Sequence, residues 1–289
     1  MGEQVIPEPQ RTYLLELLSA LGPAAKGLVL VGGHALRFMI ARPRATRDFD
    51  FVLDVVYLRG CDTSLASVLA SLGYSVAENA RNFQFEKPIP NSPEVMRIEF
   101  MAPAEFARRD EIRVDVQNGV HGRACVGGSI VVVETDGYEV VGSLPDGRPA
   151  RVEVKVTRPH ALVFLKLLAM DERYHNVRGS AHAEHDREEA RIHAGDIVAV
   201  LSAQANLGEF RNRFARQFGQ DAALKGRAYQ IIRDYFRDET KPGLVLYGES
   251  LITSLPSDET VRDLGSELHR AQRLVSSFVL EQQGASRVT

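Results

Sequence analysis

Apolar residues near the start of the chain have spacings that predict a helix followed by a strand. Over residues 8–21, Tyr and Leu side chains return with helical spacing, and Gly22-Pro23 would end the helix. Residues 27–31 form a short apolar run that predicts a strand leading into Gly32-Gly33. Residues 34–41 then predict a short helix.

Acidic and apolar residues alternate over residues 48–54, which predicts a strand with one polar and one apolar face. A helix is predicted over residues 61–72, and extended segments are predicted near 74–77, 82–86 and 95–101. The first part of the chain therefore combines strands and helices.

A Val-rich stretch over residues 112–156 predicts further strands. Four dipeptides typical of hairpin turns interrupt it: Asn118-Gly119, Gly127-Gly128, Asp136-Gly137 and Asp146-Gly147. Helical periodicity then dominates residues 159–285, with helices predicted over 159–174 and 188–204.

These patterns predict an α+β fold in two domains. Residues 1–156 would form a mixed sheet with flanking helices, and residues 157–289 an all-helical domain. If the first domain carries the chemistry, we expect the second to complete a cleft for the ligand.

Composition narrows the class of protein. The chain has 289 residues, of which 44% are hydrophobic and 25% charged, which are ordinary globular values. No apolar run approaches the ~20 residues of a membrane span, and the N-terminus lacks a signal-peptide pattern. Cys61 and Cys125 lie far apart in sequence, so we expect reduced thiols. We therefore expect a soluble cytoplasmic protein without a membrane partner.

The basic residues are mostly arginine, with 29 Arg among the 35 Lys and Arg. Arg makes bidentate contacts with phosphate, although a GC-rich genome would produce the same bias.

The alternating segment holds the main candidate chemistry. Asp48 and Asp50 would share one face of their strand, and two adjacent carboxylates are typical either of an exposed surface or of a divalent cation site. Mg²⁺ prefers oxygen ligands and is commonly held by one or two carboxylates together with substrate phosphates. Gly32 and Gly33 precede a predicted helix, where backbone N–H groups can bind phosphate, although such a pair can also be only a tight turn.

The order and spacing of these features resemble a known signature. Gly32-Gly33, fourteen further residues, and then Asp48-x-Asp50 between apolar residues are similar to the motif of the DNA polymerase β-like nucleotidyltransferase superfamily. The form Gly-Gly-x-Ala-Leu followed by Arg-x-Thr-x-Asp-x-Asp resembles the AbiEii/AbiGii abortive-infection branch, the toxin nucleotidyltransferases. Many members have Gly-Ser in place of Gly32-Gly33.

The resemblance implies a third acidic residue on a neighbouring strand. Glu99 and Asp115 are the two candidates, and we favour Glu99 because a Pro follows it closely. A later helical motif of the family, Lys-x-x-Ala with a following Arg, matches Lys166, Ala169 and Arg173, and a downstream Asp-Ile matches Asp196-Ile197.

Lys166 is surrounded by apolar residues in its predicted helix, so it would either extend to solvent or meet a negative partner. Asp196 also lies on an apolar stripe and needs a cationic partner, for which Lys166 or Arg173 would serve.

The resemblance thus implies an Mg²⁺-dependent (or Mn²⁺-dependent) nucleotidyltransferase that uses an NTP. The acceptor would be a tRNA 3′ end, and the protein would be a toxin with a cognate antitoxin. Asp48, Asp50 and Glu99 would bind the metal, and Lys166 would act with them in catalysis. The nucleotide-binding residues would be Gly32, Gly33, Arg47, Lys166, Arg173 and Asp196.

Two other functions remain open on the sequence. The chain could transfer nucleotides to a small molecule or a protein, or it could be a catalytically silent nucleotide-binding module of the same fold. No Walker lysine follows the glycines and the full Gly-x-Gly-x-x-Gly is missing, which argues against a P-loop NTPase and a Rossmann dehydrogenase.

Two further clusters are weaker signals. His175, His182, His185 and His193 fit no zinc pattern and favour a solvated loop. Residues 211–237 interleave basic and aromatic side chains, which predicts amphipathic helices with an aromatic core or, alternatively, a basic face for RNA.

Overall fold

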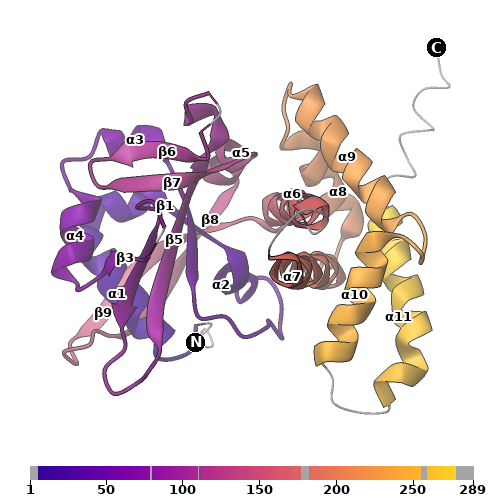
Figure 1. Cartoon of the computed structure of the whole chain (residues 1–289), viewed down its shortest axis with the longest axis horizontal. Helices are drawn as coiled ribbons and strands as arrows, with labels where there is room; N and C mark the ends of the chain where they lie inside the picture. The colour runs from indigo at the N-terminus through magenta and orange to yellow at the C-terminus, as the bar shows by residue number, and fades with distance from the viewer. Residues whose placement is uncertain (1–5, 79, 110, 177–181, 255–258, 278–289) are drawn as a thin grey trace. The chain divides into compact units, whose positions relative to one another are not determined.

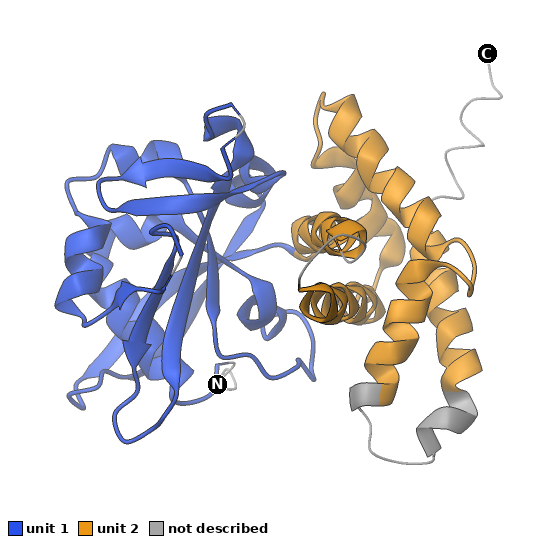
Figure 2. Ribbon diagram, viewed as in Figure 1, with its two compact units in different colours: residues 1–158 blue, residues 159–289 orange. Residues whose placement is uncertain are grey.

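A computed structural model describes residues 6–78, 80–109, 111–176, 182–254 and 259–277. The chain divides into two compact units, residues 1–158 and residues 159–289 (Figure 2).

The first unit is built on a mixed sheet, which confirms the predicted α+β class. Within the described residues the sheet has nine strands, and its main order is β3-β4-β5-β2-β1-β9-β8, with β7 paired to both β5 and β6 (Figure 1). The strands are β1 (Leu28–Val31), β2 (Phe49–Leu53), β3 (Ser75–Val76), β4 (Gln84–Pro88), β5 (Val95–Pro103), β6 (Arg113–Gln117), β7 (Val120–Cys125), β8 (Thr135–Ser143) and β9 (Pro149–Thr157).

The strand order places β2 at the centre of the sheet. β2 pairs antiparallel with β1 and parallel with β5, so the three strands that carry the candidate motifs are direct neighbours. Asn118-Gly119 and Asp146-Gly147 join antiparallel pairs, β6–β7 and β8–β9, as their turn chemistry predicts.

An aromatic cluster fills the buried face of the central strands. Phe51 lies 6.3 Å from Phe100 between ring centroids, and Phe100 lies 5.7 Å from Phe85. All three are buried, because alternate residues of β2, β4 and β5 point to the same face of the sheet. The polar alternates point to the other face.

The helices of this unit are short except for the first, which packs against β8 and β9 with its Leu side chains buried. They are α1 (Gln10–Leu21), η1 (Gly22–Gly27), α2 (Gly32–Leu36), α3 (Val55–Arg59), α4 (Leu65–Ser71), η2 (Ala104–Phe106) and α5 (Gly128–Val133).

The structure corrects three local predictions and adds one helix. The helix predicted over 34–41 begins at Gly32 and ends at Leu36, after which turns with i→i−3 hydrogen bonds follow. Helix α3 was not predicted; it is only five residues long and is capped by Asp54. Gly127-Gly128 is not a hairpin, because Gly127 is the N-cap of α5 with φ +80°. Asp136-Gly137 is not a turn either, because both residues pair with β9 inside β8.

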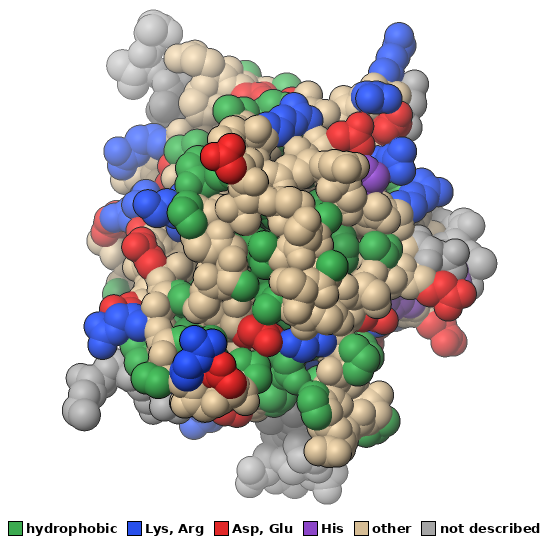
Figure 3. Space-filling model, turned by 90° about the vertical axis from the view of Figure 1, so that its left-hand side faces the viewer, with side chains coloured by type: hydrophobic (Ala, Val, Ile, Leu, Met, Phe, Trp, Pro, Cys, Tyr) green, Lys and Arg blue, Asp and Glu red, His purple; other side chains and the backbone are tan. Residues whose placement is uncertain are grey.

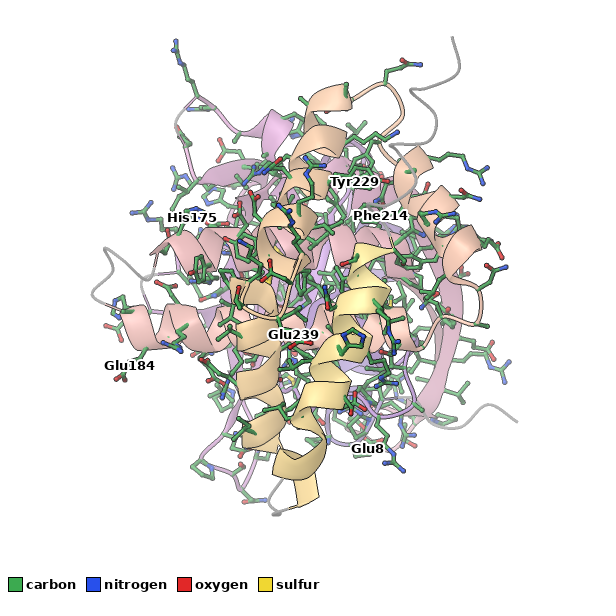
Figure 4. The ribbon with its side chains drawn as sticks, turned by 90° about the vertical axis from the view of Figure 1, so that its right-hand side faces the viewer. Glu8, His175, Glu184, Phe214, Tyr229 and Glu239 are labelled. Carbon is green, nitrogen blue, oxygen red and sulfur yellow. The ribbon has the colours of Figure 1, made fainter. Side chains whose placement is uncertain are left out.

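The regular elements described in the second unit are all helices. Its helices are α6 (Pro159–Asn176), α7 (Ala183–Ser202), α8 (Leu207–Arg216), α9 (Ala222–Phe236), α10 (Pro242–Ser254) and α11 (Glu259–Ser276). The starts of α8 and α9 carry N-caps, Asn206 and Asp221, whose side chains accept backbone N–H groups. Phe214 of α8 and Tyr229 of α9 meet edge to face, with ring centroids 5.9 Å apart (Figure 4).

Charged side chains of both signs are interspersed on the face drawn in Figure 3, in line with the net charge of −3. Of the helices in the described part of the chain, none combines the length and the hydropathy that crossing a membrane requires.

Candidate active site

The glycine turn lies directly against the acidic strand. Gly32 follows β1 with φ +65°, a backbone conformation that side chains rarely adopt. A Cβ added to Gly32 would lie 1.8 Å from Oδ2 of Asp50. A Cβ on Gly33 would lie 2.8 Å from Cβ of Thr46. The two glycines therefore let the turn approach Asp50 and Thr46 at distances that no other residue permits.

Three carboxylates lie on the polar face of β2 and β5. Asp50 is opposite Glu99 in the parallel register of these strands, so the two side chains are neighbours on one face. Asp48 immediately precedes β2 on the same face as Asp50. The apolar alternates Phe49 and Phe51 are buried on the opposite side.

Arginine and glutamine side chains from adjacent strands hold these acids. Glu99 uses both oxygens: Arg123 Nε lies 2.9 Å from Oε1, and Gln84 Nε2 donates to Oε2 at 2.9 Å. Arg97 donates to Glu86 and lies 3.9 Å from Asp48. The acidic face is thus compensated by two cations that the sequence did not single out.

The electrostatic environment of Asp48 is unfavourable for its ionised form. Partial burial, followed by repulsion from Glu99 and Glu86, raises the pKa of Asp48, while Arg97 and Arg47 act in the opposite direction. A carboxylate crowded by other carboxylates in this way is one that a cation would stabilise.

Asp115 occupies a different environment from Glu99. It is exposed on β6, a strand that pairs with β7 and has no register with β2. Its carboxylate lies 3.3 Å from His121 Nε2 and 3.5 Å from Arg108. Of the two candidates for the third acid, Glu99 is the one that the sheet places beside Asp50.

The donor set of Asp48, Asp50 and Glu99 has the oxygen chemistry that Mg²⁺ prefers. Within the residues that the structure describes, no three His, Cys, Asp or Glu side chains converge closely enough to hold a metal ion as they stand. Both carboxylate oxygens of Glu99 have protein partners, Arg123 and Gln84. The three acids therefore supply the oxygen ligands that suit Mg²⁺, while Glu99 is in contact with other side chains of the protein.

Arg47, predicted to bind the nucleotide, lies one residue before Asp48. Its guanidinium is exposed and lies 2.8 Å from Glu94. It is therefore close in sequence to the acidic face and accessible to solvent.

In the helical unit, Lys166 and Asp196 form a buried ion pair. Lys166 Nζ lies 2.8 Å from Asp196 Oδ2, and the two residues are only 6% and 4% exposed. His193 Nδ1 lies 3.3 Å from the same ammonium. Asp196 thus pairs with Lys166, one of the two partners considered from the sequence.

Arg173 has a partner that sequence reasoning missed. Its Nη1 donates to the buried Asp186 at 2.7 Å, within the same helix pair α6–α7. Asp186 lies before the helix predicted over 188–204, whereas α7 begins at Ala183 and includes it. His175 likewise belongs to a local network with Asp171 and Tyr235.

The aromatic residues of segment 211–237 form core, as the amphipathic alternative predicted. Its described aromatic side chains are all buried: Phe214, Phe218, Tyr229, Tyr235 and Phe236. Several of its arginines have local partners, such as Glu209 for Arg213 and Gln230 for Arg233.

Comparison with known families identifies the chain. The family described as "Nucleotidyl transferase AbiEii toxin, Type IV TA system" matches residues 16–260, which covers both units. Comparisons with curated proteins and with solved structures give no significant match. The family match shows that this chain belongs to the AbiEii family and is a nucleotidyltransferase, the toxin of a type IV toxin–antitoxin system.

Proposed function

We propose that this nucleotidyltransferase moves a nucleoside monophosphate from an NTP to the 3′ hydroxyl of an RNA, in an Mg²⁺-dependent reaction. The acceptor that the family resemblance favours is a tRNA. The observation that carries the proposal is the register of Asp50 with Glu99, beside Asp48 and against the Gly32 turn. This arrangement places the carboxylates beside a backbone turn that a ligand can approach closely.

Asp48 and Asp50 would hold the divalent cation, and Glu99 would complete its ligand set. The cation would neutralise charge on the reacting phosphate and position the attacking and leaving oxygens. Glu99 would also accept the proton of the acceptor hydroxyl, because it is the acid on the strand farther from the glycine turn.

The glycine turn and Arg47 would bind the triphosphate. Gly32 and Gly33 have no side chains to block a phosphate, and the backbone can approach it closely. Arg47 is exposed and next to Asp48, so it can exchange Glu94 for a phosphate without disrupting a buried interaction.

The roles of Lys166, Arg173 and Asp196 in nucleotide binding stay predictions. Their contacts within the helical unit are ion pairs, Lys166 with Asp196 and Arg173 with Asp186. These pairs support a role in holding α6 against α7. We propose that the positive charge of Lys166 also serves nucleotide binding, as the motif resemblance implies.

The proposal is tested by incubating the purified chain with Mg²⁺, total tRNA and each of the four α-labelled NTPs in turn. We expect label on RNA, and no label when periodate has destroyed the 3′ hydroxyl. Asp50→Asn should abolish transfer. Asp146→Asn, at an exposed hairpin acid paired with Arg148, is the matched control and should transfer like wild type.

Two results would contradict the proposal. Transfer that survives Asp50→Asn would exclude the acidic strand as the metal site. Label that appears on a protein or small molecule but never on RNA would replace the RNA acceptor with one of the other two substrate classes.

A further inference from the structure

A second polar feature lies on the sheet beyond Glu99, where β6 and β7 extend it. A cavity of about 420 Å³ is lined by Arg81, Glu111, Ile112 and Arg113. Ile112 is 56% exposed, although it is a large apolar residue. The cavity therefore combines two guanidinium groups and one carboxylate with an apolar side chain, so its two cations can contact a phosphate of a nucleic acid backbone.

The two strands beside this cavity present like charges to each other. Arg113 of β6 is directly opposite Arg123 of β7 in their antiparallel register. Like charges in this position destabilise a sheet, unless nearby anions compensate them. Glu99 compensates Arg123 at 2.9 Å, whereas Arg113 is paired with Glu111 at the longer distance of 3.8 Å. Arg113 is therefore the less closely compensated of the two arginines, and a bound anion would add to its compensation.

The backbone around Arg81 is held in an unusual conformation. Arg81 and Asn82 have φ of +45° and +62°, which are uncommon for residues other than Gly. His121 fixes this turn, because its Nδ1 lies 2.9 Å from the Arg81 carbonyl and its backbone N–H donates to the Asn82 carbonyl at 2.9 Å. The turn places Arg81 next to the start of β4, where Gln84 contacts Glu99.

The sheet order separates this cavity from the glycine turn. β1 with the turn lies on one side of β2, and β5 followed by β7 lies on the other. In an in-line displacement the leaving pyrophosphate and the attacking hydroxyl are on opposite sides of the reacting phosphorus. If the glycine turn holds the triphosphate, the acceptor must therefore approach from the β5–β7 side.

We propose that Arg81 and Arg113 bind the backbone phosphates of the acceptor RNA, next to its 3′-terminal hydroxyl, on the β5–β7 side of Glu99. This inference rests on the proposed function, since it takes the acceptor to be a nucleic acid strand. Arg123 connects the cavity residue Arg113 with Glu99 of the acidic face. It lies opposite Arg113 in the register of β6 and β7, and its Nε lies 2.9 Å from Glu99 Oε1.

The test measures binding of a short single-stranded RNA with a free 3′ hydroxyl to the full-length chain, without NTP, over a range of salt concentrations. Removing one arginine that neutralises a phosphate should reduce the slope of log K against log salt by about 0.7. We expect Arg81→Gln with Arg113→Gln to reduce the slope by about 1.4 and to weaken binding at least about tenfold at moderate salt.

The matched control removes two arginines elsewhere in the same unit. Arg148 and Arg151 are exposed and paired with acids in the β8–β9 hairpin, so Arg148→Gln with Arg151→Gln makes the same charge change. This control should bind RNA within about twofold of wild type. The pair Arg81→Lys with Arg113→Lys should recover most of the salt slope, because it keeps the charge.

The outcomes separate this inference from the proposed function. Loss of RNA binding by the glutamine pair, with an unchanged Kd for NTP, supports the pocket even if the wild type transfers nothing to RNA. Wild-type affinity and salt slope in the glutamine pair would overturn the pocket while RNA transfer stands. A raised KM for NTP with unchanged RNA binding would assign the cavity to the nucleotide instead. Absence of RNA binding by the wild type would also overturn it.

Discussion

Gly32 and Asp50 are so close that the glycine has no room for a side chain. A Cβ on Gly32 would lie 1.8 Å from the carboxylate oxygen Oδ2 of Asp50, well inside any van der Waals contact. The turn after β1 and the acid in β2 are therefore one structural unit, in which the glycine is required by the neighbouring strand and not only by a ligand.

Gly32→Ala should therefore abolish nucleotide transfer and destabilise the protein. The φ of +65° costs an alanine about 1–2 kcal/mol, and the clash with Asp50 adds to this cost by displacing the carboxylate. We expect a fall in the free energy of unfolding of more than about 2 kcal/mol, measured by urea denaturation, and loss of more than about 99% of transfer activity.

Gly147→Ala separates the two causes. Gly147 has φ +83° in the β8–β9 hairpin, and a Cβ there would meet nothing within 4 Å. This variant should lose only about 1 kcal/mol and keep full activity. Equal stability losses in the two alanine variants would show that the contact with Asp50 is relaxed in solution.

Glu99→Gln and Asp115→Asn test which acid completes the site. Glu99 is in register with Asp50, whereas Asp115 is exposed on a strand that has no register with β2. We expect Glu99→Gln to reduce kcat at least about a hundredfold with the KM for NTP little changed. Asp115→Asn should stay within about threefold of wild type in kcat. The reverse ranking in steady-state kinetics would move the third acid to β6.

Sequence patterns predicted the acidic strand and its faces because alternation has a direct physical meaning in a strand. Asp48 and Asp50 on one face and Phe49 on the other follow from the period of two. The same rule could have identified Arg97, which lies two residues before Glu99 and shares its face. Arg123 could not be found in this way, because its position beside Glu99 depends on the pairing of β5 with β7.

Turn dipeptides were less reliable, because the same glycines also occur inside strands and at the starts of helices. Gly137 lies inside β8, where a Cβ would come within 2.5 Å of Glu153 Oε1, so this glycine serves close cross-strand packing. Gly127 is the N-cap of α5. This helix was not predicted, because its Ile and Val residues are typical of strands. In both cases the packing of neighbouring elements determines the role of the glycine, and a single sequence does not show that packing.

His34 should make stability depend on pH between about 6.5 and 3. Its ring is fully buried against Phe49, and burial, followed by the charges of Arg37 and Arg44, lowers the pKa of His34 to about 3. Below pH 6.5 the unfolded chain binds a proton that the folded chain does not bind, so stability is complete above this pH and is lost as the pH falls. At pH 5 the loss is on the order of 2 kcal/mol.

His34→Leu should remove this contribution. The difference in unfolding free energy between pH 7 and pH 5, from urea titrations, should be smaller by about 2 kcal/mol in the variant than in wild type. His185→Ala, at an exposed histidine, should leave the difference unchanged. An identical pH dependence in wild type and His34→Leu would mean that His34 gains protons in the folded state as easily as in the unfolded state.

Lys166 and Asp196 should be strongly coupled in stability. Their ion pair is buried between α6 and α7, so removing one partner leaves the other charge buried without its oppositely charged partner. We expect Lys166→Met or Asp196→Leu alone to cost about 3–5 kcal/mol, and the double variant to cost much less than their sum, because it replaces both charges with apolar groups. A double-mutant cycle in urea measures this coupling. The double variant also separates packing from chemistry. If it folds stably but no longer binds NTP, the charged pair contributes to nucleotide binding, whereas normal NTP binding would restrict the pair to holding the two helices together.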